Sequence, residues 1–346
     1  MRGTMMRGTM TQGTMTALLG VAFAAASAGA APAQTAADFY KGKTVQFMVG
    51  YGPSGGFDAY TRAAARFMGK HIPGNPNVIV QNMPGASSLQ FVRYMATRAP
   101  TDGTQWGMFN RGLMPKSVLD PKEVGVDFSR FTWIGSMNSE MAMCYFWATK
   151  GIRTIDDITK VPFTLGDTSK NSGGYIYTSI LRSLSADKGK MVLGYATTGD
   201  IWLATERGEV DGNCTVLTSV QSQRPEWLPQ KKINVVVQFA EQRHKDLPDV
   251  PTIFEIVKDE RQRQAINFLI ASEEIGRPVI GPPGMQRADV IRKAFMDTMK
   301  DPEFIAFAEK AQMDMDPMTG EKAAAIAAAI QNTPQEAVEI ARKFMD

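Results

Sequence analysis

The sequence predicts an α/β protein that folds as two units, and three observations lead to this prediction. The chain has 346 residues, and single hydrophobic cores stop growing beyond roughly 250–300 residues. Apolar strand patterns alternate with helical patterns along almost the whole chain, which is typical of parallel α/β construction. Hydrophobic residues make up 44% and charged residues 21% of the chain, as in an ordinary globular protein.

The first 33 residues are expected to be an export signal rather than part of the fold. Arg2 and Arg7 supply a positive start, residues 16–30 supply an apolar run, and a small-x-small pattern ends at Ala33. A transmembrane anchor is the alternative, but the run is shorter than about 18 residues and is rich in alanine. We therefore expect cleavage near Ala33 and a periplasmic protein, and Met6 is an equally good start codon.

The first unit is expected to open with a strand over residues 45–50 and a helix over residues 57–70. Its remaining predicted elements are a strand over 78–82, a helix over 87–99, and strands over 104–110, 131–137 and 141–149.

The second unit is expected to start with a short helix over residues 154–160, whose first turn carries Asp156 and Asp157. Its other predicted elements are a strand leading into a Gly/Ser loop over 163–174, a helix over 175–187, a strand over 191–196, a helix over 200–210, a strand plus connector over 212–220 and a buried strand over 233–240. After it come helical patterns near 260–272, a strand and turn over 277–284, and helices over 286–299, 302–311 and around 320–344.

Charge and cysteine content exclude several classes of partner and cofactor. Without Arg2 and Arg7, the 38 basic residues fall to 36 against 35 acidic ones, so no nucleic-acid partner is expected. The chain has only two His and two Cys, which predicts neither a metal site nor a cofactor. Export permits a disulfide between Cys144 and Cys214, and two separate buried thiols are the open alternative.

Residues 50–60, GYGPSGGFDAY, form a glycine loop between a strand and a helix, with the spacing G-x-G-x-x-G. A dinucleotide site would need an acidic residue at the end of the next strand, but that strand ends in Gln81 and Asn82. No Lys-Ser/Thr follows the glycines, so the loop is not a P-loop. A helix that starts near Phe57 still offers free N–H groups, which bind carboxylate as readily as phosphate.

Two further helix starts have a similar composition. Residues 166–177, GDTSKNSGGYIY, join a strand to a helix through hydroxyl, amide and glycine groups. Residues 194–202, GYATTGDIW, offer Thr197, Thr198 and Asp200 as capping groups. Plain helix capping is the alternative for each loop, including for Asp58 in the first helical turn after the glycine loop.

The sequence shows no recognisable set of nucleophile, base and orienting residue. The chain has no H-E-x-x-H motif, and His71 and His244 lie in separate polar segments. Glu273 and Glu274 are neighbours and are interpreted as a solvated surface pair, since adjacent residues on a helix do not face each other. We therefore expect no enzymatic activity.

Several ordered motifs together resemble a known family. They are FYKGKTVQFMVGYGPSGGFDAYTR at 39–62, NPNVIVQNMPGASS at 75–88, RAPTDGTQWGMF at 98–109, GYATTGDIWLATERGEVDG at 194–212, LPDVPTIFE at 247–255 and IGPPGM at 280–285. The sequence resembles the solute-binding receptors of tripartite tricarboxylate transporters, the Bug or TctC-like family. The resemblance runs from about residue 38 to near the C-terminus.

The resemblance implies a periplasmic-binding-protein-like type II architecture, in which two α/β lobes joined by a crossing-strand hinge close on a ligand. It implies that residues 34–137 and 246–346 form lobe 1 and that residues 138–245 form lobe 2. Carried over by position, the ligand-binding residues are Tyr51, Pro53, Ser54, Gly55, Gly56, Phe57, Asp58, Thr168, Ser169, Asn171, Ser172, Gly173, Tyr195, Thr197 and Asp200. Ser54 stands where glycine is usual, and Lys170 is either a cation for a second carboxylate of the ligand or a solvent-facing residue.

The expected function is capture of a small organic carboxylate, a di- or tricarboxylate or an aromatic acid, and its delivery to the membrane permease subunits of a transporter. Four aromatic residues suit an aromatic acid if they wall the cleft: Tyr51, Phe57, Tyr175 and Trp202. The protein is expected to act as a monomer. Two alternatives stay open, namely an exported enzyme that uses the same cleft and a ligand-sensing subunit of a signalling system.

Overall fold

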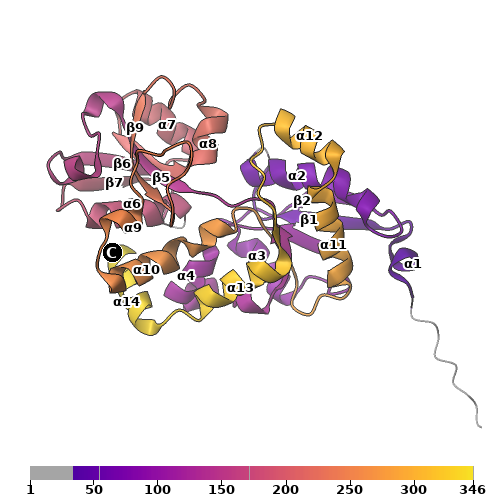
Figure 1. Cartoon of the computed structure of the whole chain (residues 1–346). Helices are drawn as coiled ribbons and strands as arrows, with labels where there is room; N and C mark the ends of the chain where they lie inside the picture. The colour runs from indigo at the N-terminus through magenta and orange to yellow at the C-terminus, as the bar shows by residue number, and fades with distance from the viewer. Residues whose placement is uncertain (1–33, 54, 171, 346) are drawn as a thin grey trace, which may run out of the picture. The chain divides into compact units, whose positions relative to one another are not determined.

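The structure is a computed structural model that describes residues 34–53, 55–170 and 172–345. The export signal expected over residues 1–33 lies outside the described residues, as do Ser54 and Asn171 of the expected site. Among the helices that the structure describes, none combines the length and apolar character that a membrane crossing requires. The described strands form two sheets, which Figure 1 shows with their helices.

The first sheet has the strand order β11-β4-β10-β3-β1-β2. Its strands are β1 (Thr44–Val49), β2 (Asn77–Asn82), β3 (Gln105–Met108), β4 (Thr132–Ser136), β10 (Pro278–Gly281) and β11 (Met318–Thr319). Strand β1 pairs in parallel with β2 and β3, whereas β10 pairs antiparallel with β3 and β4. In β1, Val45, Phe47, Met48 and Val49 are buried, as expected for a central parallel strand.

The second sheet has the strand order β7-β6-β8-β5-β9. Its strands are β5 (Ala142–Trp147), β6 (Phe163–Asp167), β7 (Gly189–Leu193), β8 (Gly212–Val216) and β9 (Ile233–Phe239). Strand β6 runs parallel to β7 and β8, and β5 runs antiparallel to β8 and β9. Cys144 on β5 lies directly opposite Cys214 on β8, with Cα atoms 4.0 Å apart, and the two form a disulfide.

Fourteen α-helices are found in the described residues, and most of the predicted ones are present. Their bounds are α1 (Ala36–Tyr40), α2 (Gly56–Met68), α3 (Leu89–Thr97), α4 (Leu113–Leu119), α5 (Pro121–Val124), α6 (Gly173–Ser183), α7 (Thr198–Glu206), α8 (Leu217–Gln223), α9 (Ile253–Ile256), α10 (Glu260–Ile270), α11 (Ala288–Met299), α12 (Pro302–Lys310), α13 (Gly320–Gln331) and α14 (Gln335–Met345).

Two predicted helix starts are wrong for local reasons, and one predicted helix is of another type. The helix predicted from residue 87 begins at Leu89, because Ser87 and Ser88 have left-handed φ values of 52° and 77°. The helix predicted from residue 286 begins at Ala288, because Arg287 has φ 57°. The short helix predicted over 154–160 is a 3₁₀-helix, Ile155–Thr159.

Helices α10 and α14 pack against helices that belong to both sheets. They pack on each other, and α14 also packs on α6 and on α4. Phe109 and Trp133, from the side of the first sheet, therefore share one continuous hydrophobic core with Phe146 and Ile180, from the side of the second. The strand predicted over 141–149 as part of the first unit is β5 of the second sheet. The lobe boundaries expected at residues 137/138 and 245/246 stay predictions.

Two segments cross between the sheets side by side, residues 137–141 and residues 272–277; we call them the crossing segments. The first joins β4 to β5, and the second leads into β10. Three backbone hydrogen bonds connect them: Met137 N–H donates to Arg277 O (3.2 Å), Glu140 N–H to Glu273 O (2.9 Å) and Gly276 N–H to Asn138 O (2.9 Å). The chain thus passes between the sheets as a paired double connection.

Candidate functional site

A cavity of about 730 Å³ is lined by residues from both sheets and both crossing segments. Tyr51 and Asn110, which follow β1 and β3, line it from the first sheet. Asp167 and Val216, at the ends of β6 and β8, line it from the second. These are carboxyl ends of strands, the edge at which open α/β sheets usually bind ligands.

Helix α2 presents its N-terminus to the cavity without a side-chain cap. Gly55 at the N-cap and Gly56 at the first helical position both line the cavity, and the N-cap residue Gly55 provides no side-chain cap for this helix end. The first backbone N–H groups of a helix have no acceptor within it, and the helix dipole adds partial positive charge there. A Cβ at Gly56 would meet one atom within 4 Å, Nη2 of Arg277 at 3.4 Å, which is an ordinary van der Waals contact.

Helix α6 starts at the opposite wall. Its N-cap Ser172 accepts a hydrogen bond from Tyr175 N–H at 3.0 Å, and Gly173 and Gly174 follow in the cavity wall. A Cβ at Gly174 would lie 2.5 Å from Asp167 Oδ2 and 2.8 Å from Cys214 O. Only glycine therefore fits position 174, and the first turn of α6 lies tight against β6 and β8.

Helix α7 contributes a third N-terminus, closed by a capping box. Thr197 Oγ1 accepts from Asp200 N–H at 3.2 Å, and Asp200 Oδ2 accepts from Thr197 N–H at 2.9 Å. Thr197, Thr198 and Tyr195 line the cavity, but exposed Asp200 does not. Helix capping, the alternative role considered for Asp200, thus accounts for the hydrogen bonds of this residue.

The structure gathers most of the expected binding residues at this cavity. Those that line it are Tyr51, Pro53, Gly55, Gly56, Phe57, Thr168, Ser169, Ser172, Gly173, Tyr195 and Thr197. Asp58 does not line it; this side chain is 3% exposed, and its carboxylate accepts from Arg62 Nε and Asn82 Nδ2, each at 2.8 Å. Asp58 therefore fastens α2 to the end of β2.

The aromatic residues divide between the cavity and the core. Tyr51 stacks on Phe57 with ring centroids 4.6 Å apart, and both line the cavity together with buried Trp202. Tyr175 does not line it, since its hydroxyl donates to Met345 O at 3.0 Å. Lys170 is exposed and lies at a different, 560 Å³ cavity beside α4 and α14.

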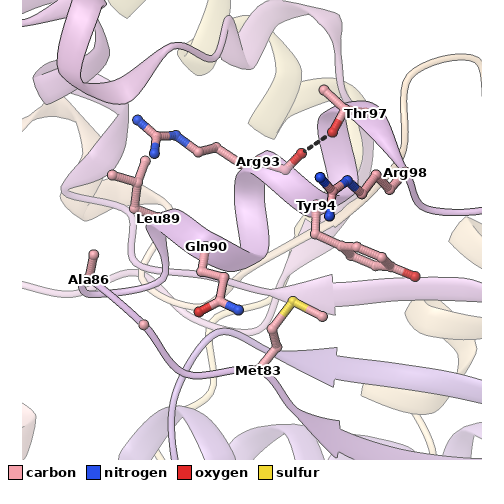
Figure 2. Close-up of a pocket in the computed structure, with 9 residues that line it drawn as sticks. Met83, Ala86, Leu89, Gln90, Arg93, Tyr94, Thr97 and Arg98 are labelled. Atoms are coloured by element: carbon pink, nitrogen blue, oxygen red, sulfur yellow. Dashed lines mark hydrogen bonds between the residues drawn. The ribbon is translucent and has the colours of Figure 1, made fainter.

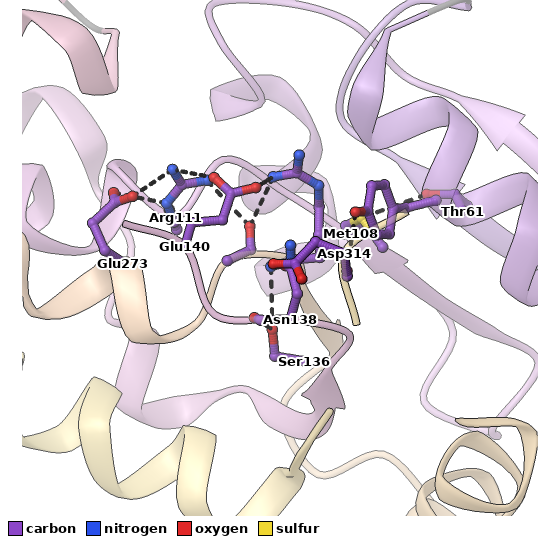
Figure 3. Close-up of polar contacts among 11 residues, drawn as sticks. Thr61, Met108, Arg111, Ser136, Asn138, Glu140, Glu273 and Asp314 are labelled. Atoms are coloured by element: carbon purple, nitrogen blue, oxygen red, sulfur yellow. Dashed lines mark hydrogen bonds and ion pairs between the residues drawn. The ribbon is translucent and has the colours of Figure 1, made fainter. Parts of the chain in front are cut away.

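Four charged side chains form a buried ion network at the crossing segments, which was not predicted from the sequence (Figure 3). Arg111 donates two hydrogen bonds to Glu273, from Nε to Oε1 at 2.7 Å and from Nη2 to Oε2 at 2.6 Å. Arg111 Nη2 also lies 2.7 Å from Glu140 Oε2, and Arg277 pairs with Glu140. All four residues are buried and line the cavity. Two cations and two carboxylates balance, so the network adds no net charge.

This network corrects the interpretation of Glu273 and Glu274 as a solvated pair. Glu273 is 5% exposed and bound to Arg111, whereas Glu274 is exposed. Burial alone would lower the pKa of Arg111, but the charges of Glu140 and Glu273 raise that pKa well above its ordinary value. The signal available in the sequence was weak: a charged residue, Arg111, just after a buried strand.

Asp167, at the end of β6, is a second cavity residue that the sequence did not single out. Burial raises its pKa above the ordinary value of 3.8, although hydrogen bonds from Ser172 and Thr168 act to lower it.

Within residues 34–53, 55–170 and 172–345, no group of three or more His, Cys, Asp or Glu could hold a metal ion.

A smaller cavity of about 440 Å³ lies against α3 (Figure 2). Arg93 and Tyr94 on its wall are already engaged, because Arg93 Nε donates to Val124 O (3.1 Å) and Tyr94 OH to Gln105 Oε1 (2.7 Å). It is lined from the first unit alone, so a ligand there would not bridge the two sheets.

The fold is similar to that of known solute-binding proteins. A TctC solute-binding protein from Polaromonas matches with a TM-score of 0.65 at 19% identity, over 88% of this chain and 99% of that one. The periplasmic binding protein BugD matches with a TM-score of 0.65 at 18% identity, over 88% and 98%. The R. palustris protein Rpa4515, solved with adipate, matches with a TM-score of 0.64 at 15% identity, over 87% and 97%.

No family model matches the chain, and no curated protein matches it. The structural likenesses confirm the predicted fold class, an α/β periplasmic-binding-protein-like architecture with two sheets.

Proposed function

We propose that this protein is an extracytoplasmic solute-binding receptor that captures a small organic carboxylate and delivers it to membrane permease subunits. The observation that carries the proposal is the convergence of helix starts from both sheets on one cavity of about 730 Å³. The adipate in the structurally similar R. palustris protein supports a carboxylate as the class of ligand. The export signal expected over residues 1–33 supports a periplasmic location.

Backbone groups rather than free cationic side chains would hold the carboxylate. Arg111 and Arg277 line the cavity, but Glu140 and Glu273 already balance their charges. The uncapped start of α2 offers N–H groups at Gly56 and Phe57, and such groups bind anions well. We propose this helix start as the main carboxylate anchor.

Closure around the ligand would follow from its contacts with both sheets. A ligand shifts a conformational equilibrium only by its difference in affinity for the two states. A ligand bridging α2 and the β6–α6 loop would favour a closed state, with the crossing segments as the hinge. A permease would then recognise the closed form of a monomeric receptor.

Isothermal titration calorimetry with a panel of small carboxylates tests this proposal. At least one member should bind, and Gly56→Val should lower its affinity by about tenfold or more, because the branched side chain covers the α2 start. A Cβ is tolerated at this position, so the variant should fold. Ala59→Val, on an exposed position of the same helix, is the matched control and should bind as the wild type does.

Two results would contradict the proposal. One is a folded wild-type protein, judged by circular dichroism, that binds no member of the panel. The other is a Gly56→Val variant with unchanged affinity, which would remove the α2 start from the site.

A further inference from the structure

Asp167 has one carboxylate oxygen that is satisfied and one that is not. The side chain is 2% exposed and lines the 730 Å³ cavity. Its Oδ1 accepts hydrogen bonds from Thr168 N–H at 2.6 Å and from the Ser172 hydroxyl. Its Oδ2 is buried and has no hydrogen-bond partner among the residues that the structure describes. A buried acceptor without a partner carries a cost of desolvation that a ligand can remove.

The carboxylate of Asp167 lies beside the N-terminus of α6. Its Oδ2 would lie 2.5 Å from a Cβ at Gly174, so it sits against the first turn of that helix. The positive end of the α6 dipole thus faces a carboxylate that belongs to the chain itself. A carboxylate of the ligand at this place would meet a like charge, which is unfavourable in a partly desolvated cavity.

Asn213 makes the same wall richer in acceptors. Its Nδ2 donates a hydrogen bond to Gly166 O at 2.7 Å. Its buried Oδ1 has no hydrogen-bond partner in the described part of the chain. The residue lines the cavity from β8, the strand next to β6. The wall from the second sheet therefore presents acceptors, whereas the α2 start across the cavity presents donors.

We infer that the ligand is an amino-carboxylate, with its carboxylate at the α2 start and a cationic nitrogen at Asp167. The inference rests on the proposed function and narrows its class of ligand. A protonated amine donates hydrogen bonds and compensates a buried negative charge, and a second carboxylate can do neither. The balanced pairs of Arg111 and Arg277 leave Asp167 as the unbalanced charge of the described cavity wall.

Matched ligand pairs test the inference by titration calorimetry. Each pair consists of a linear dicarboxylate, from succinate to adipate, and the amino acid in which an amine replaces one terminal carboxylate. A set of α-amino acids accompanies them. The best amino-carboxylate should bind about tenfold or more tightly than the best dicarboxylate.

Asp167→Asn separates the role of the charge from that of the loop. The amide oxygen still accepts from Thr168 N–H and Ser172, so the loop should fold, which a thermal melt checks. Affinity for the amino-carboxylate should fall by about tenfold or more, because its partner charge is gone. Asp156→Asn, an exposed residue of the same unit outside the cavity, is the matched control and should bind as the wild type does.

The outcomes distinguish this inference from the proposed function. Tighter binding of dicarboxylates, or unchanged amino-carboxylate affinity in folded Asp167→Asn, overturns the inference and leaves a carboxylate receptor. Binding of neither series to folded protein removes the proposed function and the inference with it.

Discussion

Arg111 and Glu273 lie 162 positions apart in the sequence and meet in a two-pronged ion pair at the crossing segments, with Nη2 2.6 Å from Oε2. The pair fastens the end of β3 to the segment that leads into β10. Glu140 on the other crossing segment joins it, so both chain connections between the sheets meet at one buried cluster of charges on the cavity wall.

Removing one charge of this pair should be costly. Glu273→Gln leaves Arg111 buried with only part of its compensation, and we expect the free energy of unfolding to fall by about 3 kcal/mol. Urea unfolding followed by circular dichroism measures this. Glu336→Gln, which breaks the exposed pair with Arg261, is the matched control and should change stability by under about 1 kcal/mol. Equal effects of the two changes would contradict a structural role for the buried network.

The two glycines at the start of α6 should respond differently to the same change. Gly174→Ala places a methyl group against Asp167 Oδ2 and Cys214 O, and should cost about 1–3 kcal/mol of unfolding free energy. At Gly173 the nearest atom to a Cβ is 3.9 Å away, so Gly173→Ala should leave stability within about 1 kcal/mol of the wild type. Similar melting temperatures for both variants would speak against the tight packing of α6 on β6.

The Cys144–Cys214 disulfide should add measurable stability. It closes a loop with a sequence separation of 70, and removing such a bond typically costs about 2–5 kcal/mol. The double variant Cys144→Ala/Cys214→Ala should therefore unfold at lower urea than the wild type. Dithiothreitol should lower the midpoint of the wild type and leave that of the double variant unchanged. A wild-type midpoint insensitive to the reductant and equal to that of the variant would contradict the bond.

Glu255 should contribute stability that depends on pH. Hydrogen bonds from Arg243 and from Thr252 N–H lower its pKa from 4.5 to about 2. Because the pKa is lower in the folded than in the unfolded state, the contribution is present above about pH 4.5 and is lost as the pH falls toward 2. The stability difference between wild type and Glu255→Gln should therefore be smaller at pH 3 than at pH 7. A stability difference that does not depend on pH would contradict this prediction. Glu241→Gln, at an exposed position, serves as the control.

The parts of the site that depend on local sequence could be predicted. Glycine loops between a strand and a helix identified the starts of α2 and α6, and Thr197 and Asp200 identified the cap of α7. Those patterns are local because helix starts are specified within a few residues.

The parts that depend on distant contacts could not be predicted. Glu273 and Glu274 have the same side chain, and only the meeting with Arg111 makes one buried and the other exposed. The delayed start of α3 depends on Ser88, whose hydroxyl donates to Gly50 O at 3.1 Å and accepts from Asn110 N–H at 3.2 Å. Those partners come from two different strand ends, so no local pattern marks the turn.

Binding of a carboxylate at the α2 start can be measured residue by residue through a backbone amide titration by NMR of ¹⁵N-labelled protein with the tightest-binding carboxylate. The largest shift changes should fall on Gly56 and Phe57 at the start of α2, with a second group at Gly173 and Gly174. Saturable changes confined to other residues, such as those around Tyr94 at the cavity beside α3, would contradict it.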